Sequence, residues 1–394
     1  MSDTLSPSID RNGVLAPINA SMKKVSIWQA LPGFRESMPG LLAMFVIAAF
    51  CGLPGLPWPF TIEKLLSYID HVLPPIYGKG LFIDLLHFNY VVIGLVVGIV
   101  IRNVIGVPKS WESGISFTPV MMNTGIVLLG TQYLLRDLVK LGGQSITLMA
   151  IFVFGSATIV ILLCRLLKIG DRLTGLLSAG FSMCGVSAVV AIAPMVKART
   201  DQVAYAIASL ITFGVTCLFL LPWVGRLVGI PEYAFGIWSA TGVPNSAQVI
   251  ATGFNYGFEA GKVAGFANIG RIVLIPAGVL YIYFLVFTAE FRREKISFWE
   301  VIKDKFPIFV FGFVGLWVVN CMHVFPLPAR YAMEQVMIWF FTLCFVGIGL
   351  QTKFSDVKSA GLKGIAIAWL AGVIKVFTCL IAILIGMKMG YFVK

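Results

Sequence analysis

Two short polar stretches interrupt long apolar runs of this sequence, and their side chains are suited to binding a small solute. Both contain glycine and hydrogen-bonding residues, and the second also contains Pro244. In lipid, an interrupted helix leaves backbone N–H and C=O groups unpaired, which is tolerated only where protein or a wet cavity satisfies them. We therefore predict a binding site near the middle of the membrane, formed by Ser182, Cys184, Gly185, Ser187, Thr241, Gly242, Asn245, Ser246 and Gln248.

The chemistry of these interruptions suits an anion. A half-helix that restarts at mid-membrane directs free N–H groups and the positive end of its dipole at the break. Ser182 or Ser187 is placed to cap such a start, and Pro244 suits the first turn of a second half-helix. Because small residues also line ordinary helix contacts, close packing is the alternative explanation of both stretches.

Two cations inside predicted spans strengthen the anion hypothesis. Arg271, three residues after Asn268, lies near the centre of one span, and Lys375 lies near the centre of another. A cation at the bilayer centre costs at least ~2.5–3.5 kcal/mol, so it usually serves function. A planar guanidinium also matches the oxygens of sulfate, sulfonate or carboxylate. We therefore add Asn268, Arg271 and Lys375 to the predicted substrate site.

Both cations have an alternative explanation. Arg271 would also suit a contact with helix carbonyls, and Lys375 is equally suited to act as a fixed charge in place of a coupling ion. The predicted spans contain no obvious carboxylate pair at mid-depth. That absence argues against a sodium/proton antiporter with an aspartate-centred ion site.

The composition indicates an all-α polytopic membrane protein. Hydrophobic residues make up 58% of the chain, charged residues 12%, and the mean hydropathy is +0.92. The net charge of +12 fits cations on cytoplasmic loops, and no nucleic-acid-binding motif accompanies it. The seven cysteines all lie in apolar segments and are predicted to be buried residues rather than disulfides or metal ligands. Because no metalloprotease, nucleophile-elbow or P-loop motif occurs, we expect neither enzymatic activity nor a cofactor.

Apolar runs predict about eleven transmembrane helices in one transporter domain, 38–394, preceded by a polar cytoplasmic segment, 1–37. With the N-terminus inside, eighteen cations fall on the cytoplasmic side and ten on the other. The proline-rich segment 57–87 is predicted to be an interfacial connection. The predicted spans are 38–56, 88–105, 113–135, 145–168, 172–197, 202–229, 233–257, 260–289, 306–326, 333–353 and 364–387.

Two blocks of the sequence, about 88–168 and 305–387, echo each other. The echoes suggest a duplicated block of helices, and seven intervening spans would give the two copies opposite orientations. An inverted repeat of this kind is typical of secondary transporters. The matched pairs are Gly130/Gly349, Gln132/Gln351, Asp137/Asp356, Gly142/Gly361 and Ile146/Ile365 at an offset of 219, and Val97/Val314, Gly98/Gly315 and Asn103/Asn320 at an offset of 217.

These residues resemble the sulfate-exporter family of bacterial inner-membrane proteins over roughly 88–388. Residues 182–188 resemble its Ile-Cys-Gly-x-Ser-Ala motif, and residues 247–253 resemble its Ala-Gln-Val-Val-Ala-Ala-Gly stretch. Residues 271–276 resemble its Arg-Val-Leu-Leu-Leu-Ala-Pro segment, and residues 306–313 resemble its Pro-x-Phe-Val-x-Gly-Phe helix entry. The chain departs from the family by lacking its His-Glu before Ala247 and by carrying Asn268 where the family has Lys.

The resemblance implies the inverted-repeat architecture of sodium/proton antiporters and bile-acid symporters, with a mobile core sliding against a scaffold. The missing acid, imidazole and ammonium imply altered substrate or coupling. We therefore predict a secondary active transporter of a small anion, of elevator type, in the cytoplasmic membrane. A sodium- or proton-coupled symporter of an organic solute and an anion channel are the alternatives, and a homodimer is compatible with an elevator scaffold.

Overall fold

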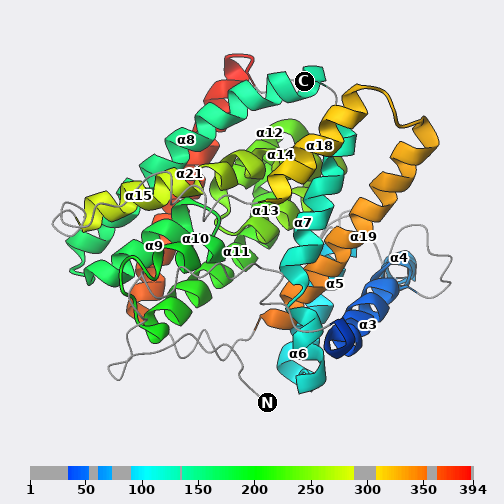
Figure 1. Ribbon diagram of the computed structural model, residues 1–394, viewed down its shortest axis with the longest axis horizontal. Helices are drawn as coiled ribbons and strands as arrows, with labels where there is room; N and C mark the ends of the chain where they lie inside the picture. The colour runs from blue at the N-terminus through cyan, green and yellow to red at the C-terminus, as the bar shows by residue number, and fades with distance from the viewer. Residues whose placement is uncertain are drawn as a thin grey trace.

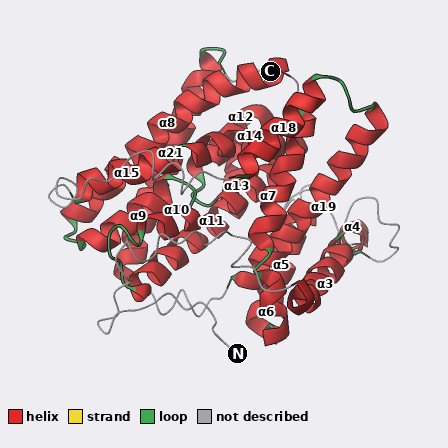
Figure 2. Cartoon of the chain, viewed as in Figure 1, coloured by secondary structure: helices red, strands yellow, loops and turns green. Residues whose placement is uncertain are grey.

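The computed structural model describes residues 34–52, 61–72, 90–133, 135–287, 308–352 and 362–391. Within these ranges the chain forms helices and loops and contains no strand (Figure 2). Most of the predicted N-terminal segment and of the predicted interfacial connection lie outside the described residues, as do Asp356 and Gly361 of the second echo. All seven cysteines are free, and six of them are buried, as predicted.

The helices form two groups that lie side by side (Figure 1). The first, which we call the flanking group, contains α3 (Phe34–Cys51), α4 (Ile62–Val72), α5 (Tyr90–Val100), α6 (Lys109–Ile115), α7 (Thr118–Leu129), α18 (Phe309–Cys321) and α19 (Leu327–Gln351). The second, the hairpin group, contains α8 (Leu135–Leu166), α9 (Asp171–Ser182), α10 (Val186–Ile192), α11 (Thr200–Val228), α12 (Glu232–Gly242), α13 (Ser246–Tyr256), α14 (Phe258–Val273), α15 (Ile275–Val286) and α21 (Leu362–Lys388).

Several of these helices have the length and composition of membrane spans. Five described segments are long and apolar enough, and α14 with α15 makes a sixth if this pair, bent by 50°, is one span. Two further apolar helices, Val92–Ile105 and Phe309–Cys321, are shorter. All eleven predicted ranges coincide with a helix or with a run of consecutive helices in the described chain, but two of these runs fold back on themselves.

The predicted span 172–197 is wrong, because this segment doubles back instead of crossing. Gly175, early in α9, faces Val196 after the end of α10, and Gly180 faces Val189. The two helices are therefore antiparallel, with their turn at residues 183–185. We call α9 and α10 hairpin 1.

The predicted span 233–257 is wrong for the same reason. Phe235 of α12 stacks on Tyr256 of α13, with ring centroids 3.8 Å apart, and the Ser239 hydroxyl donates to Val249 O at 2.8 Å. At the open end, the Glu232 carboxylate accepts from the N–H of Glu259 at 2.9 Å. We call α12 and α13 hairpin 2.

The hairpins enter the molecule from opposite ends. Helix α11 begins beside the base of hairpin 1, where Gln202 shares a cavity with Asp171 and Lys197. It ends beside the base of hairpin 2, where Arg226 Nη2 donates to Asn255 O at 2.8 Å. Because the single helix α11 connects the two bases and Gly185 lies against Asn245, the tips of the hairpins point toward each other.

Equivalent contacts join the two echoing blocks inside the flanking group. Asn103 Nδ2 donates to Thr352 O at 2.9 Å, and Asn320 Nδ2 donates to Tyr133 O at 2.9 Å. Offsets of 217 and 219 residues relate the two donors and the two acceptors. The same hydrogen bond is therefore made twice. One joins the π-helical turn after α5 (Ile101–Ile105) to the residue after α19, and the other joins α18 to Tyr133, which follows the 3-10 turn after α7 (Gly130–Gln132).

Lysines end two helical segments at the hairpin 1 end of the molecule. Lys168, after α8, has φ 56°, and Lys197, after α10, has φ 50°. This backbone conformation favours glycine, because the Cβ of any other residue costs about 1–2 kcal/mol there. The favourable interaction of a cation with the helix C-terminus is smaller, about 0.3–1 kcal/mol. The bonds that close the two turns run from Lys168 N to Arg165 O, Ile169 N to Cys164 O, Lys197 N to Pro194 O and Ala198 N to Ala193 O.

Candidate functional site

The candidate site lies where the tips of hairpins 1 and 2 meet. A Cβ added at Gly185 in the tip of hairpin 1 would lie 3.0 Å from Asn245 Cα and 3.1 Å from Asn245 Cβ in the tip of hairpin 2. Only a residue without a side chain allows the two backbones to approach this closely. The tips therefore bring the two interrupted stretches of the sequence together.

Local sequence explains both turns. Gly185 adopts φ 70° and ψ −119°, which is unfavourable for residues with a Cβ, and it precedes the first residue of α10. Asn245 has an extended backbone and caps α13, because its Oδ1 accepts from the N–H of Ala247 at 3.4 Å. A glycine turn and an asparagine cap thus begin the two returning half-helices next to each other.

Arg271 holds the inward end of α12. Its Nη1 donates to Ala240 O at 3.1 Å and to Val243 O at 2.5 Å, and its Nη2 donates to Asn268 Oδ1 at 2.8 Å. Only 1% of Arg271 is exposed. The cation lies at the negative end of the α12 dipole, where it satisfies carbonyls that have no partner within the helix.

Lys375 holds the inward end of α9 in hairpin 1. Its Nζ donates to Phe181 O at 2.7 Å, at the inward end of α9, and only 3% of the residue is exposed. The side chain comes from α21, which also accepts the Trp238 indole N–H at Val376 O, 3.1 Å away. Helix α21 therefore contacts both hairpins close to their tips.

The two buried cations have no acidic partner among the residues that the structure describes. Neither forms an ion pair there, and their charges lie close enough to act on each other. Two donors beside them, Arg271 Nε and Asn268 Nδ2, are buried and make no hydrogen bond within the same residues. The site thus combines two cations that no described acidic side chain neutralises with unused N–H groups.

Other predicted residues are placed at or near the tips. Ser246 Oγ donates to Asn268 Oδ1 at 3.1 Å, which links the start of α13 to Arg271. Cys184 is buried in the tip of hairpin 1, whereas Ser187 is exposed and Asn245 is half-buried. The tips are therefore reachable from outside the protein at Ser187.

The remaining predicted residues contribute less to the meeting point. Gln248 turns away to α11, where its Nε2 donates to Ile211 O at 2.9 Å. The hydroxyls of Ser182 and Thr241 donate to carbonyls of their own helices, at Ser178 and Ile237. Gly242 ends α12 and lies beside α21.

The sequence prediction missed the carbonyls that the cations contact and one neighbouring thiol. Phe181, Ala240 and Val243 contribute only their backbone oxygens, for which no side-chain signal exists. Cys379 is buried and lies one helical turn after Lys375 on α21. Its position four residues after Lys375 on one helix was visible in the sequence and would have indicated a shared face.

Comparison with known proteins matches this chain over most of its length. The family model described as Conserved hypothetical protein 698 covers residues 39–368. The chain belongs to this family. A UPF0324 membrane protein of Nitratidesulfovibrio vulgaris is 36% identical to it over 357 residues, which cover 90% of this chain and 94% of the relative.

Two further UPF0324 membrane proteins show the spread of the similarity. One from the same organism is 34% identical over 338 residues, covering 82% of this chain and 92% of the relative. One from Bacillus cereus is 27% identical over 284 residues, which cover 72% of this chain and 79% of the relative. No solved structure matches the chain significantly. As a member of Conserved hypothetical protein 698 with several apolar helices of spanning length, the chain is a multi-pass membrane protein.

Proposed function

We propose that this membrane protein is a secondary transporter of a small anion such as sulfate, a sulfonate or a carboxylate. The observation that carries the proposal is the pair of buried cations, Arg271 and Lys375, at the inward ends of the two hairpins without a described acidic partner. Burying a charge costs several kcal/mol, and the carbonyls that these two cations contact offset part of that cost without neutralising the charge. A bound anion would neutralise both cations at once.

The unused donors match an oxyanion. Arg271 Nε–H and Asn268 Nδ2–H lack acceptors among the described residues, and the oxygens of sulfate, sulfonate or carboxylate are acceptors only. The start of α13 adds backbone N–H groups and the positive end of a helix dipole beside Asn245. In this proposal the chain moves its ligand without any covalent step.

The arrangement of the hairpins supports alternating access. Each tip reaches the middle of the molecule from a different end, so displacement of the hairpin group would expose the same site first to one side and then to the other. Ring contacts join this group to the flanking group, such as Phe254 with Phe341 and Phe266 with Phe313. Apolar contacts of this kind suit the sliding of an elevator-type core along a scaffold.

The corrected topology strengthens an N-terminus-inside orientation in the cytoplasmic membrane. Because hairpin 1 returns to the side on which it begins, Lys197 and Arg199 move to the cytoplasmic side, and Arg226 moves to the other. The number of cations on the cytoplasmic side rises from eighteen to nineteen, and the number on the other side falls from ten to nine. The stronger bias follows the positive-inside rule.

The proposal is tested by reconstituting the pure protein in liposomes and measuring uptake of radiolabelled sulfate, with taurine and small carboxylates as competitors. Saturable uptake that a competitor suppresses supports an anion carrier, and the competition pattern gives the substrate class. A requirement for sodium would instead identify a cation-coupled symporter, and conductance far above carrier turnover an anion channel. No flux of any of these anions under sodium, proton or counter-substrate gradients contradicts the proposal.

A further inference from the structure

A cavity of about 520 Å³ lies at the base of hairpin 1, away from the meeting tips. The start of α9, the turn after α10, the first turn of α11 and the end of α15 line it. Its lining combines basic and polar side chains with apolar and aromatic ones. The lining residues are Gly170, Asp171, Arg172, Met195, Val196, Lys197, Gln202, Tyr283 and Phe287.

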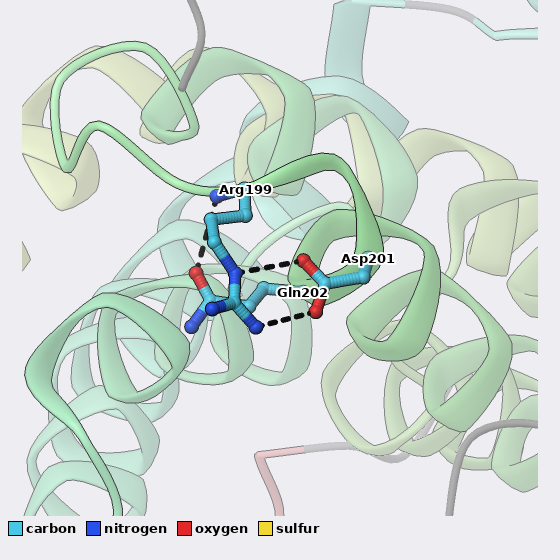
Figure 3. A network of polar contacts seen from close by, with 3 residues as sticks. All are labelled: Arg199, Asp201 and Gln202. Atoms are coloured by element: carbon cyan, nitrogen blue, oxygen red, sulfur yellow. Dashed lines mark hydrogen bonds and ion pairs between the residues drawn. The ribbon is translucent and has the colours of Figure 1, made fainter. Parts of the chain in front are cut away.

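Two of the three charged residues that line this cavity are cations. Arg172 and Lys197 are exposed at its edge. The nearby carboxylate of Asp201 is held by Arg199 through two hydrogen bonds of 3.0 and 2.6 Å, while Gln202 Oε1 accepts from the N–H of Arg199 (Figure 3). Asp171 is the one acidic lining residue, and it lies in the first turn of α9, where the helix dipole offsets its charge.

One of these cations, Lys197, occupies a backbone position where glycine would fit better, and so does the neighbouring Lys168. Of the three non-glycine residues with positive φ in the described chain, two are Lys197, which lines the cavity, and Lys168, which lies two residues before the lining residue Gly170. Both sit at the glycine position of a helix-ending turn. A charged side chain kept in a disfavoured conformation points to a use for the charge.

We infer that this cavity binds the phosphate headgroup of an anionic phospholipid. Basic pockets between membrane helices bind such headgroups, because Lys and Arg contact the phosphate while apolar residues contact the glycerol and acyl chains. Arg172 and Lys197 supply the cations, and Met195, Val196 and Phe287 supply the apolar wall. A free phosphate ion has no use for that wall, so a lipid is the favoured source of the phosphate.

A lipid in this position would connect the base of hairpin 1 to α15. The Tyr283 and Phe287 rings of α15 stack with centroids 5.5 Å apart, and Arg165 Nη2 from α8 donates to Leu285 O at 2.6 Å. The wall opposite hairpin 1 is therefore well fixed. Binding here would stabilise the base of the hairpin whatever the protein transports, so the inference does not depend on the proposed function.

The test uses the purified full-length protein in detergent micelles. Its melting temperature is measured with increasing dioleoyl-phosphatidylglycerol, dioleoyl-phosphatidylcholine or inorganic phosphate, and bound lipids are counted by native mass spectrometry. We expect phosphatidylglycerol to raise the melting temperature and to remain bound, and phosphatidylcholine and phosphate to have little effect.

Two variants and a control make the test specific. Removing both charges in Arg172→Gln with Lys197→Gln should weaken phosphatidylglycerol binding by roughly 25-fold, about fivefold for each cation. Lys109→Gln is the matched control, because this exposed lysine begins α6 in the flanking group, away from the cavity. Lys197→Gly should melt at a higher temperature without lipid, since glycine suits φ 50°, and yet bind phosphatidylglycerol more weakly.

Three results would overturn the inference. The first is equal phosphatidylglycerol affinity for the wild-type protein and the Arg172/Lys197 double variant. The second is an equal loss in Lys109→Gln, which would mean that only general surface charge matters. The third is a response to inorganic phosphate as strong as the response to the lipid, which would assign the cavity to a free anion.

Discussion

Replacing Arg271 by lysine distinguishes its role in holding α12 from its proposed role in binding the anion. The guanidinium fixes the inward end of α12 through Ala240 O and Val243 O and presents Nε–H as an unused donor. Arg271→Ala would leave two buried carbonyls unpaired at about 1–3 kcal/mol each, a large part of a typical stability of 5–15 kcal/mol. Loss of transport in the alanine variant would therefore be ambiguous. A lysine at this position keeps the positive charge and can still donate to one of the two carbonyls.

The expected effect on the anion is large. An ammonium cannot reproduce the planar fork, so the variant loses at least one charge-assisted hydrogen bond to the ligand, worth about 1.5–3 kcal/mol. This corresponds to a rise in KM for sulfate of roughly 10- to 150-fold. The assay is sulfate uptake into proteoliposomes, with the melting temperature of the same preparation measured in parallel.

Arg226→Lys provides the matched control. Arg226 also donates to helix-ending carbonyls, at Asn255 and Tyr256, but at the outer end of hairpin 2. We expect Arg226→Lys to lower the melting temperature about as much as Arg271→Lys does, and to leave the KM for sulfate unchanged. If both variants raise KM equally, Arg271 acts only by holding the fold. If Arg271→Lys leaves KM unchanged, the guanidinium does not contact the transported anion.

Three further predictions concern the fold. Gly185→Ala should lower stability by about 1–3 kcal/mol and reduce flux, because its Cβ would press on Asn245 at a positive φ; a melting temperature equal to wild type would show that the tips are not in tight contact. Asn320→Ala should cost about 1–3 kcal/mol in chemical denaturation because Asn320 is buried, and Asn103→Ala about 0.5–1.5 kcal/mol because Asn103 is exposed; no cost in either variant would argue against a shared contact in the two blocks. Burial raises the pKa of the Glu63 carboxyl above its ordinary value. The stability that the protonated form contributes is therefore lost as the pH rises through the folded-state pKa. Glu63→Gln should raise the melting temperature at pH 8 and not at pH 4.

The sequence by itself determined which segments are apolar helices and where two of them break. Hydrophobic run length is a local property, and so is the turn chemistry of Gly185 and of the Pro244–Asn245 pair. The same reasoning identified Arg271 and Lys375 as unusual, because the cost of a cation in an apolar run does not depend on the rest of the fold.

Only the tertiary structure decided that the broken segments double back. A run of about 25 apolar residues is long enough either to cross the membrane once or to enter and return, and hydropathy is the same in both cases. The direction of the second half depends on long-range packing, such as Gly175 against Val196 and Phe235 against Tyr256. The partners of the cations were hidden for the same reason, since Phe181 O and Val243 O become acceptors only where a helix ends in three dimensions.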